Sequence, residues 1–444
     1  MSPRTPGRLL VASFLALIAL GTVLLKLPWA TPPEQPIGWV DALFTATSAS
    51  CVTGLVVRDT GGGFTGFGQA VILGLIQAGG LGIMSFSLLI LSLLRGRPTF
   101  AQRAVYEQTL AGGAPGELRS LLKLVFLFTF GAEAAGAALL AARFVPDLGA
   151  AGGAWAAVFH AVSAFCNAGF ALWPDSLVRY RADAWINLVI MGLLVLGGLG
   201  FFVVHELVRG RFRWRRLSVH SKLALAVSGG LIAAGWLGFW LLEARHALAG
   251  MPWPEQLLAS LFQGVTPRTA GFNTVDFARL GAPTLFLIMM LMFVGGSPGS
   301  TAGGIKTTTF GVLLLATLTR FRGHRNVNAF GRTLTRETLG NTAAIALGGV
   351  LTVTGGVFLL LLSELPVEAQ DSGRFVALSF ETVSALGTVG LSTGATPFLE
   401  PSSRLVLAAL MFLGRLGPLT VASSLAAGST LRDWRHPEED VVVG

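Results

Sequence analysis

The chain has 444 residues, of which 52% are hydrophobic and 12% are charged. Soluble domains carry about 25% charged residues, so the composition excludes a soluble enzyme or binding domain and indicates an integral membrane protein. The net charge of +9 at pH 7 does not indicate nucleic-acid binding. Most basic residues fall in short linkers between apolar segments, where the anionic headgroups of membrane lipids are the expected partner.

The N-terminal quarter sets out an order of segments that the rest of the chain repeats. An apolar span near residues 9–28 is followed by a half-span near 38–50, a short loop that ends at Gly54 and a second apolar span near 69–94. The run at 9–28 resembles a signal peptide, but no small-residue cleavage site follows it, so we expect a retained span. A helix needs about 20 residues to cross a bilayer, and the half-span is too short.

The same order recurs three times towards the C-terminus. Further first spans are expected near 120–143, 223–244 and 341–363, half-spans near 152–165, 254–266 and 374–386, and second spans near 185–208, 284–319 and 403–427. We therefore divide the chain into four repeats, at residues 1–94, 95–208, 209–319 and 320–444.

These repeats predict the fold class. Two full spans per repeat give every repeat the same orientation, unlike the inverted repeats of many transporters, and this predicts pseudo-fourfold symmetry about the membrane normal. The half-spans are interpreted as re-entrant pore helices that stop midway through the membrane. The expected fold is an all-α integral membrane protein with eight transmembrane helices and four re-entrant pore helices.

Four short loops that end in glycine, here called the glycine loops, separate the half-spans from the second spans. Non-helical backbone at membrane depth is tolerated where protein buries it or water lines it, and such loops can offer their carbonyl groups to a dehydrated cation. Glycine lets the backbone turn these carbonyls to one axis. The predicted filter residues are Cys51, Val52, Thr53, Gly54, Cys166, Asn167, Ala168, Gly169, Arg268, Thr269, Ala270, Gly271, Gly387, Thr388, Val389 and Gly390.

Several side chains around the loops have expected roles of their own. Arg268 is expected to point behind its loop and to pair with Glu133 or Glu381. Cys51 and Cys166 occupy matching loop positions, which symmetry would hold further apart than the about 7 Å that a disulfide allows between Cα atoms. We therefore expect both cysteines to be free thiols. The C-terminal ends of the half-spans carry partial negative charge, which would stabilise a cation without a carboxylate.

The third of the second spans is interrupted by residues that disfavour helix. We expect an unwound stretch at 295–307 that gates the pathway beneath the glycine loops, the alternative being a structural break that fills a cavity. Arg415 lies in an apolar span, where charges are functional candidates; it is expected to project towards the pathway, with a buried ion pair as the alternative. The predicted gate residues are Gly295, Gly296, Ser297, Gly299, Ser300, Gly303, Gly304, Lys306 and Arg415.

The basic residues predict the orientation of the chain. Most of the 32 Lys and Arg residues fall in segments that we place inside, among them the linkers 95–119, 209–222 and 320–340. This positive-inside bias predicts cytoplasmic N- and C-termini in a multi-pass protein of a bacterial cell membrane (inner or plasma membrane). The same linkers are partly amphipathic, which favours short helices at the cytoplasmic surface.

Three segments carry a family resemblance: Thr-Pro-Arg-Thr-Ala-Gly-Phe-Asn-Thr at 266–274, Ser-Ala-Leu-Gly-Thr-Val-Gly-Leu at 384–391 and Gly-Gly-Ser-Pro-Gly-Ser-Thr-Ala-Gly-Gly-Ile-Lys-Thr at 295–307. With the four glycine loops, they resemble the Trk/Ktr/HKT superfamily of potassium transporters, and within it the Ktr-type, TrkH-like membrane subunit. The resemblance covers essentially the whole chain. It implies potassium transport, with K+ at the carbonyls of Val52, Thr53, Asn167, Ala168, Thr269, Ala270, Thr388 and Val389.

The resemblance also implies partners. Members of this superfamily form homodimers with one pore per subunit, resting on a cytosolic ring of nucleotide-binding regulatory subunits of the KtrA/TrkA type. A nucleotide would therefore act only through that partner. The 295–307 stretch corresponds to the intramembrane gate of the superfamily.

Other functions remain open on the sequence. One is a sodium-permeable member of the same superfamily, although a serine replaces a filter glycine in such relatives and all four positions are glycine here; sodium is also a candidate coupling ion or activator. Another is a secondary transporter for a different solute, which the parallel repeats and the lack of a carboxylate relay disfavour. No metal-ligand spacing, nucleophile elbow or phosphate loop indicates an enzyme.

Overall fold

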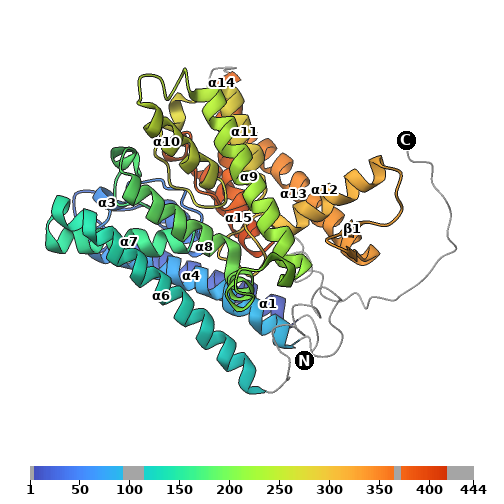
Figure 1. Ribbon diagram of the computed structural model, residues 1–444. Helices are drawn as coiled ribbons and strands as arrows, with labels where there is room; N and C mark the ends of the chain where they lie inside the picture. The colour runs from blue at the N-terminus through green and yellow to red at the C-terminus, as the bar shows by residue number, and fades with distance from the viewer. Residues whose placement is uncertain (1–4, 94–114, 365–371, 418–444) are drawn as a thin grey trace.

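The computed structural model describes residues 5–93, 115–364 and 372–417, and the regular secondary structure of these residues is almost wholly helical (Figure 1). Its first half contains α1 (Thr5–Lys26), α2 (Trp39–Ser50), α3 (Thr60–Gly63), α4 (Gly66–Leu93), α6 (Pro115–Leu148), α7 (Ala150–Phe165) and α8 (Ala184–Arg209). Its second half contains α9 (Val219–Glu243), α10 (Trp253–Val265), α11 (Ala282–Phe293), α12 (Thr307–Phe321), α13 (Arg336–Ser363), α14 (Ser372–Gly387) and α15 (Pro401–Leu416).

The long helices follow the predicted spans. Five of the described helical stretches are long and apolar enough to cross a membrane: Arg8–Lys26 of α1, Leu122–Leu148 of α6, and α8, α9 and α13. The predicted half-spans coincide within a few residues with α2, α7, α10 and α14, which have 12 to 16 residues each. These are too short to cross a bilayer, which takes about 20 residues. The last residues of the expected span 403–427 lie outside the described residues.

The four quarters of the chain pack in order. Within them, α1 packs against α2, α6 against α7, α9 against α10 and α14 against α15. Between them, α4 contacts α6 and α7, α8 contacts α9 and α10, and α11 contacts α14. Finally, α15 packs against α2, so the last quarter lies beside the first. A shared apolar cluster, which includes Ile18, Phe44, Leu378 and Leu407, fills this junction.

Two helices depart from regular geometry. The predicted break in the third second span is present: residues 294–306, here called the interrupting segment, are non-helical and separate α11 from α12. A kink in α8 was not expected. Gly200 has φ 79° and ψ 156°, which ends one helical stretch and begins another, and only glycine adopts these angles without strain.

Two of the three linkers lack the short α-helix that the sequence predicted. The linker 209–222 contains the single 3₁₀ turn η2 (Trp214–Arg216) before α9 begins. The linker 320–340 contains a hairpin of β1 (Asn328–Ala329) and β2 (Arg332–Thr333), beside α12 and α13 at the right of Figure 1. Positive φ at both Phe330 and Gly331 suits the tight turn of a two-residue hairpin. Most of the linker 95–119 lies outside the described residues.

Three further 3₁₀ turns lie in the loops that follow the glycine loops. They are η1 (Val178–Tyr180), η3 (Phe277–Arg279) and η4 (Thr396–Phe398).

Candidate functional site

The four glycine loops meet in a closed cycle. A Cβ atom added to any of the four glycines would touch the backbone of the next loop, because the carbonyl group of the residue before the next glycine lies there. The distances from such a Cβ to the carbonyl oxygen are 2.5 Å from Gly54 to Ala168, 3.0 Å from Gly169 to Ala270, 2.5 Å from Gly271 to Val389 and 2.0 Å from Gly390 to Thr53. The fourth loop thus returns to the first, and four equivalent carbonyls lie around one centre.

The backbone of every loop has the same alternation of angles. The glycine and the residue two positions before it have positive φ: Val52 (56°) and Gly54 (98°), Asn167 (60°) and Gly169 (70°), Thr269 (62°) and Gly271 (78°), Thr388 (49°) and Gly390 (89°). Alternating left- and right-handed residues turn successive N–H groups to one side. Because the peptide bond is trans, the matching carbonyls face the other side.

The N–H groups of the loops are held by the preceding half-span helix. Thr53 N donates to Ser48 O at 2.8 Å, and the equivalent bonds run from Ala168 to Ser163 (2.7 Å), from Val389 to Ser384 (2.9 Å) and from Ala270 to Thr266 (3.0 Å). The hydroxyls of Ser48 and Ser384 also accept from Gly54 N and Gly390 N, both at 3.1 Å. The carbonyls in these peptide units therefore face away from the helices: Val52, Thr53, Asn167, Thr269, Thr388 and Val389.

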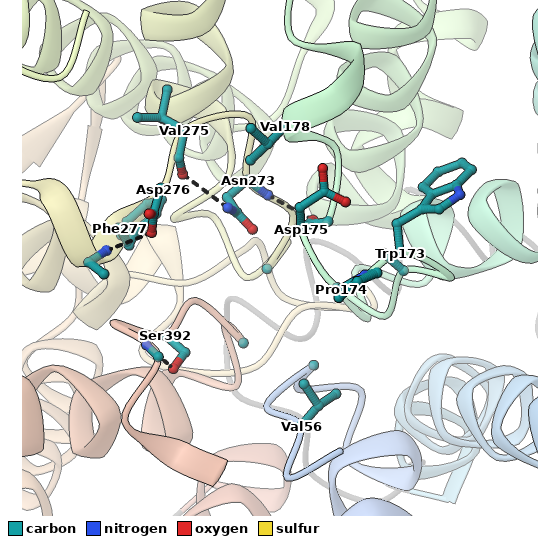
Figure 2. Close-up of a pocket in the computed structure, with 18 of the residues that line it drawn as sticks. Val56, Trp173, Pro174, Asp175, Val178, Asn273, Val275, Asp276, Phe277 and Ser392 are labelled. Atoms are coloured by element: carbon teal, nitrogen blue, oxygen red, sulfur yellow. Dashed lines mark hydrogen bonds between the residues drawn. The ribbon is translucent and has the colours of Figure 1, made fainter. Parts of the chain in front are cut away.

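A cavity of about 840 Å³, here called the vestibule, opens on one side of this cycle. All four loop glycines line it, together with the residues that follow them in each loop. Figure 2 shows side chains from four separate stretches of the chain around it, with Val56, Trp173, Asn273 and Ser392 each contributed by a different stretch.

The interrupting segment lies against three of the glycine loops. Gly303 is so close to Thr388 that a Cβ on it would lie 2.1 Å from the threonine hydroxyl. The Thr301 hydroxyl donates to Asn167 Oδ1 at 3.0 Å. Gly295 O accepts from the Arg268 guanidinium at 2.6 Å. Contacts with the second, third and fourth loops place this segment directly beside the cycle.

Backbone hydrogen bonds join the two ends of the segment to each other and the segment to α8. Gly295 N donates to Ile305 O at 2.8 Å and Thr307 N donates to Gly296 O at 3.0 Å, which closes the segment into a loop. Ser297 N donates to Gly198 O at 2.9 Å. At the α8 kink, a Cβ on Gly200 would lie 2.9 Å from the backbone of Gly299.

Two buried arginines, Arg268 and Arg415, and the half-buried Lys306 lie near the cycle and donate to backbone carbonyls. Arg415 donates to Thr301 O of the interrupting segment and, at 2.9 Å, to Gly79 O of α4. Lys306 Nζ donates to Ala302 O at 2.5 Å. Among the described residues Arg415 and Lys306 form no ion pair, so the ion pair considered for Arg415 is not found there.

The predicted pairing of Arg268 with a buried carboxylate is wrong. Arg268 donates to Gly295 O, whereas Glu133 accepts from Gln77 Nε2 at 3.3 Å and lies 3.8 Å from the Cys166 thiol. Glu381 binds the residues that follow the fourth glycine loop instead. Both cysteines are free and buried, as the sequence predicted.

A family model for the TrkH family, described as a cation transport protein, matches residues 4–427. The chain belongs to the TrkH family. Its similarity to individual members extends over nearly its whole length. It is 40% identical to a protein of Bacillus subtilis (strain 168) called Ktr system potassium uptake protein B, over 99% of this chain and 97% of the relative. It is 37% identical to the potassium/sodium uptake protein NtpJ of Enterococcus hirae, over the same shares of the two chains.

A solved structure supports the fold of this TrkH-family chain. The crystal structure of the potassium transporter TrkH from Vibrio parahaemolyticus matches it with a TM-score of 0.71 at 20% identity, over 94% of this chain and 85% of that one. The family is one of cation transport proteins, in agreement with the expectation that the chain is not an enzyme.

Sequence reasoning missed several residues that build the site in this TrkH-family chain. Ser48, Ser163 and Ser384 lie six positions before a loop glycine, and Thr266 lies five before the third, so their recurrence in the half-spans was a readable signal. Asn167 was a predicted filter residue, but its side-chain bond to Leu194 O at 3.2 Å and the role of the Thr301 hydroxyl had no such signal, because their partners are distant in sequence.

Proposed function

We propose that this chain is the ion-conducting membrane subunit of a potassium uptake system. One observation carries the proposal: four loops from four quarters of the chain meet in a closed cycle, with the carbonyl before each glycine beside the glycine of the next loop. Rings of backbone carbonyls replace the hydration shell of K+ in channel filters. The name of the relative from Bacillus subtilis, a potassium uptake protein, supports K+ as the ion.

In this function the ion binds the carbonyls of the two residues before each glycine. The helices α2, α7, α10 and α14 end at the cycle, and the partial negative charge of a helix C-terminus favours a cation there. The hydroxyls of Thr53, Thr269 and Thr388 are buried without a hydrogen-bond partner among the described residues. Buried hydroxyls normally bind a protein group, water or an ion. A conduction path would bring water and ions to these three hydroxyls.

The interrupting segment is the gate in this proposal. It lies against three glycine loops, and its glycines, Gly295, Gly296, Gly299, Gly303 and Gly304, allow backbone changes that other residues resist. Arg415 joins Thr301 O of the segment to Gly79 O of α4, so in this proposal it anchors the segment and places a positive charge beside the pathway. Arg268 attaches one end of the segment to the third glycine loop through Gly295 O, and Lys306 braces the segment internally through Ala302 O.

Sodium is the second candidate ion. The relative from Enterococcus hirae is named a potassium/sodium uptake protein, and this supports a sodium-permeable or sodium-activated system as the alternative. Glycine at all four loop positions favours potassium.

The assembly is inferred from the resemblance to the family. We infer a homodimer, a cytosolic nucleotide-binding regulatory ring of the KtrA/TrkA type and cytoplasmic termini. Exposed arginines in the linkers after α8 and α12, among them Arg211, Arg213, Arg322 and Arg332, support a cytoplasmic position for these linkers.

The experiment is potassium uptake in a bacterial strain that lacks its own potassium importers, with and without a co-expressed regulatory subunit. Growth and rubidium uptake at low external potassium are expected to depend on the chain. Liposomes containing the purified protein then compare tracer fluxes of potassium and sodium, with empty liposomes as the control. Equal fluxes would favour the sodium-permeable alternative, and no flux of either ion would exclude conduction by this subunit.

A further inference from the structure

Glu381 is a fully buried carboxylate that the conduction path described above does not use. It lies in α14, the half-span helix that leads into the fourth glycine loop. No ion pair with Lys, Arg or His involves it among the described residues. Burying a charge without a counter-charge is unfavourable unless other groups compensate, so the environment of this carboxylate requires an explanation.

Part of the compensation comes from the loop after Gly390. Glu381 Oε1 accepts from the Ser392 hydroxyl at 2.7 Å, from Thr393 N at 2.9 Å and from the Thr393 hydroxyl at 3.1 Å. Oε2 accepts from the Thr396 hydroxyl at 2.5 Å. The Ser392 oxygen also accepts from Gly394 N at 2.9 Å. The hydroxyl proton of Ser392 is therefore donated to the carboxylate of Glu381. Hydrogen bonds of this kind favour the charged form.

The equivalent positions in the other half-spans carry no charge. Like Glu381, each of the equivalent residues directly follows a buried phenylalanine in its half-span. They are Thr45, His160 and Gln263. His160 Nδ1 donates to Ala156 O at 2.7 Å and its Nε2 accepts from Leu172 N at 3.3 Å, so the ring holds one proton and is neutral.

Three of these side chains do the same structural task. His160, Gln263 and Glu381 each bind the residue three positions after the loop glycine, Gln263 through a bond of 3.0 Å to the Thr274 hydroxyl. A neutral side chain is therefore sufficient to hold such a loop. A carboxylate at Glu381 is therefore more than this task requires.

The loop that Glu381 holds forms part of the vestibule wall. Ser392, Thr393 and Gly394 line the cavity, and Figure 2 shows Ser392 at the left of the view and Trp173, which follows the second loop, at the right. The charged residues that line the vestibule balance one another: Arg58, Arg181 and Arg279 against Asp59, Asp175 and Asp276. Glu381, directly behind the wall, adds a negative charge that no lining residue offsets.

We propose that Glu381 provides the counter-charge for an alkali cation that binds in the vestibule beside residues 390–394, before it enters the carbonyl cycle. The inference rests on the proposed conduction function. Glu381 acts through the loop and is a positioning residue: the ion contacts the loop, and the carboxylate behind it raises the ion's occupancy. Charge of one sign in a low-dielectric wall raises the local concentration of ions of the opposite sign. The negative charge of Glu381 therefore lowers the potassium concentration at which uptake is half-saturated.

The test is the variant Glu381→Gln in liposomes, with initial rates measured over a range of potassium concentrations. The amide oxygen keeps the bonds from Ser392 and Thr393, and the amide nitrogen donates to the Thr396 hydroxyl, which can accept, so the loop stays in place. The expected result is an increase in the KM for K+ of about 3- to 10-fold, with a maximal rate within about twofold of the wild-type value. An unchanged KM overturns the proposal.

Two further variants separate charge from structure. Thr396→Val removes one hydrogen bond to the carboxylate but keeps its charge, and it is expected to lower thermal stability while the KM stays near the wild-type value. Glu381→Asp keeps the charge and is expected to restore most of the affinity that Glu381→Gln loses. An equal rise in KM for Thr396→Val and Glu381→Gln contradicts the proposal, because loop geometry alone would then explain the effect.

The wild-type protein gives an independent measurement if Glu381→Gln does not reach the membrane. Added choline chloride screens a cation in the vestibule from Glu381, although less than it screens two exposed charges, so the KM for K+ is expected to rise modestly with ionic strength. A KM that does not respond overturns the inference. A wild-type protein that carries no potassium contradicts the conduction function instead, so the two failures are distinguishable.

Discussion

The loop glycines are required for two separate reasons. Each has positive φ, which costs a residue with a Cβ about 1–2 kcal/mol. Each also touches the backbone of the neighbouring loop, so a side chain has no space. The second reason is the more severe, because a backbone carbonyl cannot rotate away as a flexible side chain can. Gly390 is the tightest, with Thr53 O only 2.0 Å from the place of a Cβ.

Gly390→Ser is therefore predicted to lower potassium uptake per molecule by about tenfold or more. The serine side chain would displace the carbonyl of Thr53, and the ring of carbonyls would no longer surround the ion. The matched control is Gly323→Ala. Gly323 also has positive φ (73°), but nothing lies within 4 Å of an added Cβ. It should lose only about 1–2 kcal/mol of stability and keep its uptake. Equal losses in tracer uptake for the two variants would refute the steric argument.

The helices α4 and α8 show how far local sequence determines an element. Both contain Gly-Gly-Leu-Gly, at 79–82 and 197–200, yet α4 continues as a helix and α8 kinks at Gly200. The difference comes from the neighbour: the backbone of Gly299 lies against Gly200, whereas the side chain of Phe14 lies near Gly82. A tertiary contact from the interrupting segment, which no local pattern reports, accompanies the kink.

The same distinction explains what could be predicted. Apolar length predicted the half-spans and spans, and repetition predicted the glycine loops, because both signals are local or periodic. The predicted partner of Arg268 is wrong, because a buried guanidinium can donate to a backbone carbonyl as well as to a carboxylate and no local pattern distinguishes the two. The hairpin at 328–333 was missed because its strands have two residues each, too few for a periodic signal.

The gate proposal makes a prediction about α15. Arg415→Ala removes the two hydrogen bonds that join Thr301 O of the interrupting segment to Gly79 O of α4. The segment is then less firmly held and a positive charge is lost beside the pathway, so the potassium flux per molecule is expected to rise about two- to fivefold. The measurement is tracer uptake normalised to the amount of protein in the membrane.

Arg404, on the same helix, is the control for this prediction. It pairs with Asp41 at 2.5 Å and donates to Pro397 O, and neither partner belongs to the interrupting segment. Arg404→Ala is expected to change stability by about 1 kcal/mol without raising flux. A fall in both protein level and normalised flux for Arg415→Ala would identify Arg415 as a structural brace rather than part of a gate.

At the scale of the whole molecule, the cycle joins quarters that are remote in the chain. The contact between Gly390 and Thr53 O and the packing of α15 on α2 close it. The carbonyl cycle therefore exists only when all four quarters are folded together, and a ligand that binds it must stabilise the entire assembly.

Potassium is accordingly predicted to raise the unfolding temperature of the purified protein. A ligand at about 100 times its Kd stabilises the folded state by about 2.7 kcal/mol, so the midpoint should rise with potassium concentration, and less with sodium at equal ionic strength. Choline chloride serves as the salt control. The same rise in choline would attribute the effect to ionic strength, and Gly390→Ser should lose the response.

The return of the fourth loop to the first has a consequence for biosynthesis. The ribosome delivers Thr53 to the bilayer long before Gly390 is synthesised, so the nascent protein passes through stages in which one side of its future conduit is missing. The polar loops of the early quarters therefore remain uncovered in the membrane until the last quarter has been inserted. Translocon components or chaperones that shield those loops should therefore matter more for this chain than for a protein whose pore is assembled from consecutive segments.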